Sequence, residues 1–93
     1  MNKGELVDKV AQKATVTKKQ ADAVITATIE AIMEAVSEGD KVTLVGFGSF
    51  ERRHRKEREG RNPKTGDKMA IPATEVPAFS AGKLFKDKVA TNK

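Results

Sequence analysis

The chain has 93 residues, of which 38% are hydrophobic and 33% charged, so we expect one domain with little material for a hydrophobic core. It contains no cysteine, which excludes disulfides and thiolate metal sites, and its single histidine, His54, cannot build a usual zinc site. We therefore expect no metal or cofactor, stabilisation by a second copy of the chain, and, from the net charge of +5, an anionic partner: nucleic acid, an acidic protein or an anionic membrane surface.

The predicted organisation is a single α+β domain over residues 1–93. Two helices occupy residues 1–39, a sheet with a β-arm at about 52–74 occupies residues 40–79, and a last helix occupies residues 80–90. The N-terminal stretch is too polar for a signal peptide, and no segment approaches the roughly 20 apolar residues of a membrane span. These features favour a cytoplasmic protein that does not enter a membrane.

The first helix is predicted over residues 2–14. Asn2 can cap it, Glu5 stands three residues further on as in a capping box, and apolar residues recur at helical spacing. Thr17 and Gln20 fit a T-x-x-Q capping box and mark the start of a second helix.

The second helix carries a wide apolar face that ends before Gly39, the expected left-handed residue past its C-terminus. This face consists of Ala21, Val24, Ile25, Thr28, Ile29, Ile32 and Val36. An ordinary core helix would present such a stripe, but one short neighbouring helix offers too little to cover it. We therefore expect a seam shared with a second subunit.

A strand is predicted over Lys41–Val45, where β-branched residues alternate, followed by a tight turn at Gly46-Phe47-Gly48. Phe47 and Phe50 flank this turn and are expected to hold the sheet against the helices. Base stacking by these rings is the minor alternative.

Two extended legs, Phe50–Gly60 and Asp67–Val76, are predicted to form a long β-ribbon around a turn at Asn62-Pro63-Lys64-Thr65-Gly66. A leg of ten residues would reach roughly 30 Å. The outer part carries almost no apolar side chains, and because an isolated two-stranded ribbon is marginal in water, we expect its tip to be mobile until it binds a partner.

The last helix is predicted to run from Ser80 to about Ala90. Ser80 is its expected cap, and Phe79 and Leu84 would form a hydrophobic staple across the cap.

The charge is concentrated in the ribbon. Residues 51–70 hold five arginines, three lysines and four acids, which gives +4 of the total +5. A solvated surface would also explain such a run, but arginine is the cation suited to phosphate and to the minor groove, and the ribbon serves no core of its own. Pro63 is either a turn former or a rigid wedge between base pairs, and the residues alone leave the two open. His54 is expected on the face opposite Arg53 and Arg55, as solvated surface.

The central motif resembles the bacterial histone-like HU/IHF family, and within it the HU branch of cyanobacterial type. The similarity is carried by the stretches GFGSF at 46–50, REGRNPKTG at 58–66 and IPATEVPAFSAGKLFKDKV at 71–89, and it runs from Met1 to Val89. It implies an intertwined homodimer with a helical body, a small antiparallel sheet and two protruding β-ribbon arms that enter the DNA minor groove.

The resemblance also implies which residues bind DNA. The expected set along the groove and backbone is Arg53, Arg55, Arg58, Arg61 and Lys64, with Asn62 and the intercalating Pro63 at the tip and Lys3, Lys83 and Lys86 on the body. Glu75, where relatives often carry a basic residue, and Asp67 depart from the pattern and weaken the returning leg.

The function expected from these features is nucleoid-associated binding, bending and compaction of duplex DNA with little sequence preference and a preference for nicked or kinked sites. A sequence-specific IHF-like bender is the alternative, and RNA is a possible second ligand. No catalytic site is indicated, because Asp8, Asp22 and Glu34 lie on helices without an apolar pocket. A purely protein-binding module would leave the basic arm unexplained.

Overall fold

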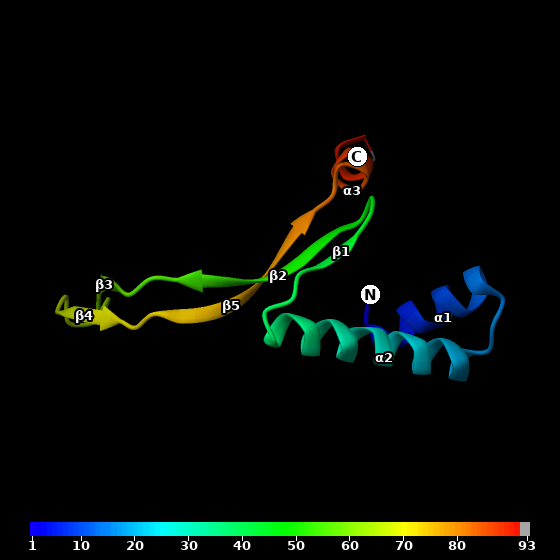
Figure 1. The fold of residues 1–93 in the computed structure, drawn as a ribbon, viewed down its shortest axis with the longest axis horizontal. Coiled ribbons are helices and arrows are strands. Elements are labelled where there is room, and N and C mark those ends of the chain that lie inside the picture. The colour runs from blue at the N-terminus through cyan, green and yellow to red at the C-terminus, as the bar shows by residue number, and fades with distance from the viewer. Residues whose placement is uncertain (92–93) are drawn as a thin grey trace. The chain divides into compact units, whose positions relative to one another are not determined.

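The structure is a computed structural model that describes residues 1–91, and it is an α+β fold of three helices and five strands (Figure 1). The elements in chain order are α1 (Lys3–Ala14), α2 (Lys18–Ser37), β1 (Val42–Leu44), β2 (Gly48–Arg55), β3 (Arg58–Arg61), β4 (Lys68–Ile71), β5 (Thr74–Ala81) and α3 (Lys83–Thr91). The chain divides into two compact units, the first spanning Met1–Glu34 and the second beginning at Ala35.

The starts of the first two helices are set by local hydrogen bonds, as predicted. The Oδ1 atom of Asn2 accepts the backbone N–H of Glu5 at 2.9 Å. At the start of α2 the capping box is complete: the Thr17 N–H donates to Gln20 Oε1 at 3.0 Å, and the Gln20 N–H donates to Thr17 Oγ1 at 3.1 Å. Each bond satisfies a backbone donor that the helix or the residue before it would otherwise leave open.

The core of the first unit is small. Val7 and Ala11 of α1 pack against Ala21 of α2, with Val10 and Ile25 at the edge of the cluster. The short side chains of two alanines let the helices approach closely but bury little apolar area.

The end of α1 is closed by a residue in an uncommon conformation. Thr15 has φ +56° and ψ +50°, the left-handed region, and the N–H of Val16 reaches back to the Ala11 carbonyl at 3.0 Å. A β-branched side chain is disfavoured in this region. The same closing geometry at the end of α2 uses a glycine: Gly39 has φ +93°, and the Asp40 N–H donates to the Ala35 carbonyl at 2.9 Å.

In the second unit a three-stranded antiparallel sheet has the order β1-β2-β5. β1 pairs with β2 from Val42 opposite Phe50 to Leu44 opposite Gly48, and is shorter than the predicted strand by one residue at each end. β2 pairs with β5 along its whole length.

The start of α3 was predicted wrongly. Ser80 does not cap the helix, because it lies in β5 opposite Ser49, and α3 begins at Lys83. Carbonyl groups of the β1–β2 turn take the place of the cap: the N–H of Gly82 donates to Phe47 at 2.8 Å, and the N–H of Phe85 donates to Gly46 at 3.2 Å. A hydrophobic staple between Phe79 and Leu84 requires a cap at Ser80, so the prediction of this staple is wrong as well.

All four phenylalanines of the chain gather in the second unit. The Phe47 ring stacks on Phe85 of α3 at 5.4 Å between centroids, and the Phe50 and Phe79 rings lie 4.8 Å apart across β2 and β5. The prediction that the rings hold the sheet against the helices is confirmed for Phe47 and α3, whereas Phe50 packs against Phe47 and Phe79.

Little apolar surface is covered by the chain itself. Among the described residues, only Val7, Ala11, Ala21 and Val36 are buried hydrophobic side chains. Larger ones remain open to solvent, among them Val24 at 64%, Met33 at 65% and Leu84 at 70% exposed.

Candidate nucleic-acid interface

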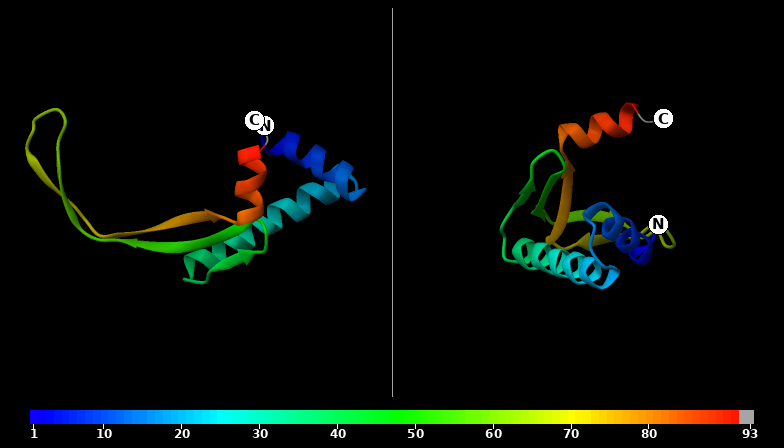
Figure 2. Two further views of the ribbon diagram at one scale, coloured as in Figure 1. Left: turned by 90° about the horizontal axis from the view of Figure 1, so that it is seen from above. Right: turned by 90° about the vertical axis from the view of Figure 1, so that its right-hand side faces the viewer.

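The ribbon predicted from the sequence is one long hairpin with an interruption. β2 pairs with β5 as far as Arg55 opposite Thr74, and β3 pairs with β4 from Arg58 opposite Ile71 to Arg61 opposite Lys68. The residue numbers of every pair add up to 129 in both ladders, so the register is continuous from the sheet to the tip. Figure 2 shows the two legs side by side along this length. We call residues 51–78 the arm.

The interruption was not predicted. Between the two ladders lie residues 56–57 on one leg and 72–73 on the other, and the structure assigns them to no strand. Pro72 has no N–H to donate to a ladder, so the paired strands separate at this point and resume beyond it.

The tip is a turn with its own hydrogen bonds. The Asn62 N–H donates to the Asp67 carbonyl at 2.9 Å, and the Gly66 N–H donates to the Asn62 carbonyl at 2.7 Å. The Asn62 side chain accepts the Lys64 N–H at 2.9 Å, so it bridges Pro63 from one side. Pro63 is exposed at the outer end of the hairpin, which is the place that the sequence predicted for it.

The two faces at the base of the arm differ. Arg53 and Arg55 share one face with their partners Val76 and Thr74, because successive side chains of a strand point to opposite sides. Arg52 and His54 lie on the other face.

Acids hold the basic side chains at the base of the arm. The Arg53 guanidinium donates a hydrogen bond of 2.9 Å to Glu51, and this bond lowers the pKa of the Glu51 carboxyl below its usual value. On the opposite face Glu75 lies 2.7 Å from His54 Nδ1 and 3.6 Å from Arg52 Nε. His54 is exposed on the face opposite Arg53 and Arg55, as predicted, and its contact with Glu75 of the neighbouring strand is an addition that was not predicted.

The outer arm is different. Within residues 1–91 the structure places no carboxylate within ion-pair distance of Arg55, at the outer end of β2, or of the five cations beyond it, which are Lys56, Arg58, Arg61, Lys64 and Lys68. Lys56 and Lys68 are the two cations of this set that the sequence did not indicate as candidate DNA contacts. Lys68 lies opposite Arg61, next to the tip, and only the pairing register could have indicated it.

The three lysines predicted on the body have different surroundings. Lys3 is already occupied: its Nζ lies 2.7 Å from Thr26 Oγ1 and 3.6 Å from Asp22. Lys83 and Lys86 lie three residues apart on α3, are exposed, and have no carboxylate at ion-pair distance within the described chain.

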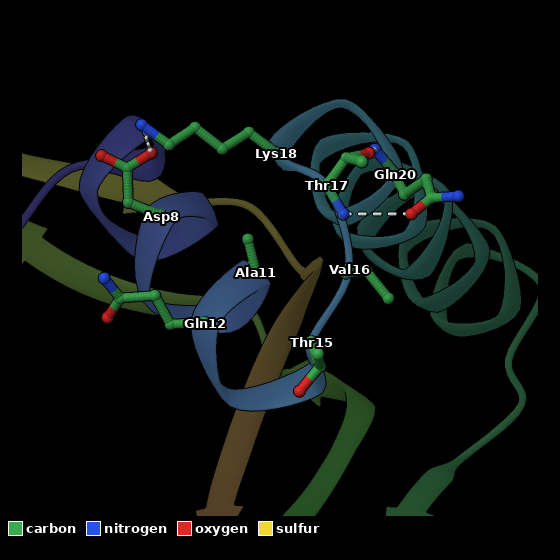
Figure 3. Close-up of a pocket in the computed structure, with 8 residues that line it drawn as sticks. All are labelled: Asp8, Ala11, Gln12, Thr15, Val16, Thr17, Lys18 and Gln20. Carbon is green, nitrogen blue, oxygen red and sulfur yellow. Dashed lines mark hydrogen bonds and ion pairs between the residues drawn. The ribbon is translucent and has the colours of Figure 1, made fainter.

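A shallow hollow lies where α1 meets α2 (Figure 3). It is lined by Asp8, Ala11, Gln12, Thr15, Val16, Thr17, Lys18 and Gln20, and the Lys18 ammonium closes one side at 3.4 Å from Asp8. Asp8 and Lys18 form an ion pair with each other, so the hollow presents no unpaired charge to a ligand. Across the part of the chain that the structure describes, no cluster of histidine or acidic side chains could hold a metal ion, and no helix is long and apolar enough to cross a membrane.

A cationic hairpin with an exposed proline is thus the most distinctive surface of the chain. Comparison with known proteins shows the family to which the chain belongs. The family model described as bacterial DNA-binding protein matches residues 1–90. The chain belongs to this family.

Individual bacterial DNA-binding proteins are similar over their whole length. The chain is 78% identical over 93 residues to DNA-binding protein HU of Nostoc sp., with 100% of this chain and 99% of the relative covered. It is 72% identical over 99 residues to DNA-binding protein HU of Synechocystis sp., with the same coverage. Among solved structures, the Anabaena HU–DNA cocrystal structure matches with a TM-score of 0.92 and 79% identity, covering 98% of this chain and 99% of that one.

These matches confirm the resemblance to HU that the motif around residues 46–66 carries. They also confirm the α+β fold, and they place the chain in a family of DNA-binding proteins rather than of enzymes.

Proposed function

We propose that this chain binds duplex DNA as a homodimer and bends and compacts it with little regard to sequence. The observation that carries the proposal is the arm: a hairpin in continuous register whose outer cations have no acidic partner. The cocrystal of a protein 79% identical to this chain with DNA supports the same ligand. Such binding would keep the protein on the nucleoid in the cytoplasm.

The homodimer is supported by the apolar surface that one chain leaves in water. Val24, Met33, Leu84 and Val89 are 63–70% exposed, and the phenylalanine cluster is still open at Phe47, which is 45% exposed. A chain of this size without disulfide or metal needs a further source of apolar burial. A second copy supplies it and also brings a second arm.

The arm would hold DNA through its phosphates. In this proposal Arg53, Arg55, Arg58, Arg61 and Lys64 lie along the groove and backbone, while Lys83 and Lys86 contact phosphates from the body. Lys3 would join them by exchanging Asp22 for a phosphate. Each lysine or arginine that neutralises a phosphate releases a counterion, which makes the affinity depend on salt.

Pro63 would act as the wedge. It is exposed at the tip and stiffened by the bond between Asn62 and Lys64, so it can enter between base pairs without ordering a flexible side chain. HU and IHF are themselves among the standard examples of minor-groove proteins that insert apolar side chains and kink the duplex, so this mechanism is carried over from the family.

Weak sequence preference follows from the side chains on the arm. Between residues 51 and 78 the sequence has one asparagine and no glutamine or serine. These uncharged side chains are suited to recognising bases by hydrogen bonds to their edges. Specificity would then come from how easily a site deforms.

The experiment is a salt titration of binding to linear duplex and to the same duplex with a nick or a kink. We expect log K to fall linearly with log salt, by about 0.9 for each phosphate neutralised, and the nicked DNA to bind more tightly. Absence of binding at low salt would contradict the proposal. A preference above about 10³ for selected over random sequence would instead favour the sequence-specific alternative, and equal binding to RNA would widen the ligand class.

A further inference from the structure

One acidic side chain at the base of the arm lies between two basic ones. Glu75 of β5 is directly opposite His54 of β2 in the pairing register. Its Oε1 lies 2.7 Å from His54 Nδ1, and its Oε2 lies 3.6 Å from Arg52 Nε. Both carboxylate oxygens are therefore engaged, each by a different basic side chain.

Arg52 is held from a second side as well. Its Nη1 donates to the carbonyl oxygen of Ser37, the last residue of α2, at 3.2 Å. This carbonyl belongs to the negative end of the helix dipole, where a cation is favoured. A Cβ added to Gly39 would lie 3.2 Å from Arg52 Nη2, so the guanidinium fits closely against the turn that follows the helix.

The electrostatic consequence for an approaching phosphate is direct. A phosphate oxygen in contact with Arg52 would also lie close to the Glu75 carboxylate, which is bound to the same guanidinium. Attraction to one unit charge and repulsion by another at similar distance nearly cancel, since both follow the same dependence on distance. The cations of the outer arm carry no such neighbour.

We infer that Glu75, together with the Ser37 carbonyl, keeps Arg52 out of the DNA-contacting set. Arg53 has a single partner, Glu51, and is freed when a phosphate replaces that carboxylate, whereas Arg52 would have to leave two partners. The inference rests on the proposed function, because it concerns which cations of the arm act on DNA. Glu75, which looked in the sequence like a loss of positive charge, thus becomes a determinant of how many phosphates the arm engages.

The test is the salt dependence of binding by Glu75→Gln. Glutamine keeps the size of the side chain and can still accept a hydrogen bond from His54, but it no longer neutralises Arg52. We expect the slope of log K against log salt to steepen by about 0.9 for each arm that gains one phosphate contact. The control is Glu57→Gln, which removes the same charge from the arm at an acid that has no ion pair within residues 1–91.

A second pair of variants identifies the cation. Arg52→Gln alone should leave the slope unchanged, and the double variant Arg52→Gln with Glu75→Gln should lose the gain of the single Glu75→Gln variant. Thermal unfolding of each variant checks that the base of the arm still folds. If Arg52→Gln alters the fold, Arg52→Met in the Glu75→Gln background replaces it. Methionine keeps an extended side chain without the charge, so this variant should also lose the gain.

Three results would overturn the inference. Glu57→Gln could steepen the slope as much as Glu75→Gln, Glu75→Gln could leave the slope at its parent value, or Arg52→Gln alone could flatten the slope. All three leave the proposed function standing, because that function is tested on the parent protein, by its salt-dependent binding to DNA and its preference for selected over random sequence.

Discussion

The backbone N–H of Gly82 donates a hydrogen bond of 2.8 Å to the carbonyl oxygen of Phe47, and this bond ties the start of α3 to the turn between β1 and β2. The two segments meet so closely that a Cβ on Gly82 would lie 3.2 Å from the carbonyl carbons of Gly46 and Phe47. Gly82 therefore permits the close approach of these two backbone segments, and the contact orients the helix that carries Lys83 and Lys86.

Gly48→Ala should destabilise the protein by at least about 2 kcal/mol. Gly48 has φ +154°, and a Cβ there would lie 2.5 Å from the Ser80 carbonyl oxygen, which belongs to the backbone and cannot move aside. Gly66→Ala is the control: it also has positive φ, +73°, but nothing lies within 4 Å of the added atom, so it should cost about 1–2 kcal/mol. Urea unfolding measures both, and equal losses would refute the clash.

Thr15→Gly should stabilise the protein by about 1 kcal/mol, because glycine adopts the left-handed conformation of residue 15 without the steric strain that threonine bears. Thr15→Ala keeps a Cβ and should gain less. Thermal unfolding at fixed protein concentration is the measurement. A melting temperature no higher for Thr15→Gly than for Thr15→Ala would contradict the strain.

The bond between Glu51 and Arg53 predicts a dependence of stability on pH. Because the pKa of Glu51 is lowered in the folded protein, its contribution is fully present above the usual value of 4.5 and is lost as the pH falls through the folded value. The difference in unfolding free energy between the parent and Glu51→Gln should therefore shrink as the pH is lowered below 4.5. Arg53→Gln removes the donor and should abolish the same part of the profile. A difference that stays constant down to pH 3 would rule the linkage out.

Pro63→Ala should reduce DNA bending more than affinity for plain duplex. Without the ring, the wedge is lost while the cations remain, so the preference for nicked over linear DNA should fall roughly tenfold, or about 1.4 kcal/mol. Fluorescence transfer between dyes at the two DNA ends measures the bend. Pro77→Ala, at a proline opposite Arg52 in β5, is the matched control and should bend DNA like the parent. An unchanged bend in Pro63→Ala would exclude the wedge.

The sequence predicted those features that depend on nearby residues. The caps of α1 and α2 are examples, because Asn2 with Glu5 and Thr17 with Gln20 lie within one helical turn. The arm was predicted for a similar reason. Its legs are extended, its turn is marked by proline and glycine, and its many charged side chains cannot form a hydrophobic core.

Features set by distant contacts were missed. The start of α3 depends on carbonyls of Gly46 and Phe47, which satisfy its first donors in place of Ser80. The partners of His54 and Arg52 depend on the register of β2 with β5, which the predicted turn at residues 62–66 does not fix, because a shift of one residue in how the turn closes changes every pair.

The continuous register of the arm also limits how its length can change. A residue removed from one leg alone would shift the pairing on its outer side by one position and turn every side chain there to the opposite face. For a residue removed from the first leg, Arg61 would change face while Lys68, now opposite it, would not, and the tip would present a different surface. Arms of this design can therefore be shortened or extended only by matched deletions or insertions on both legs.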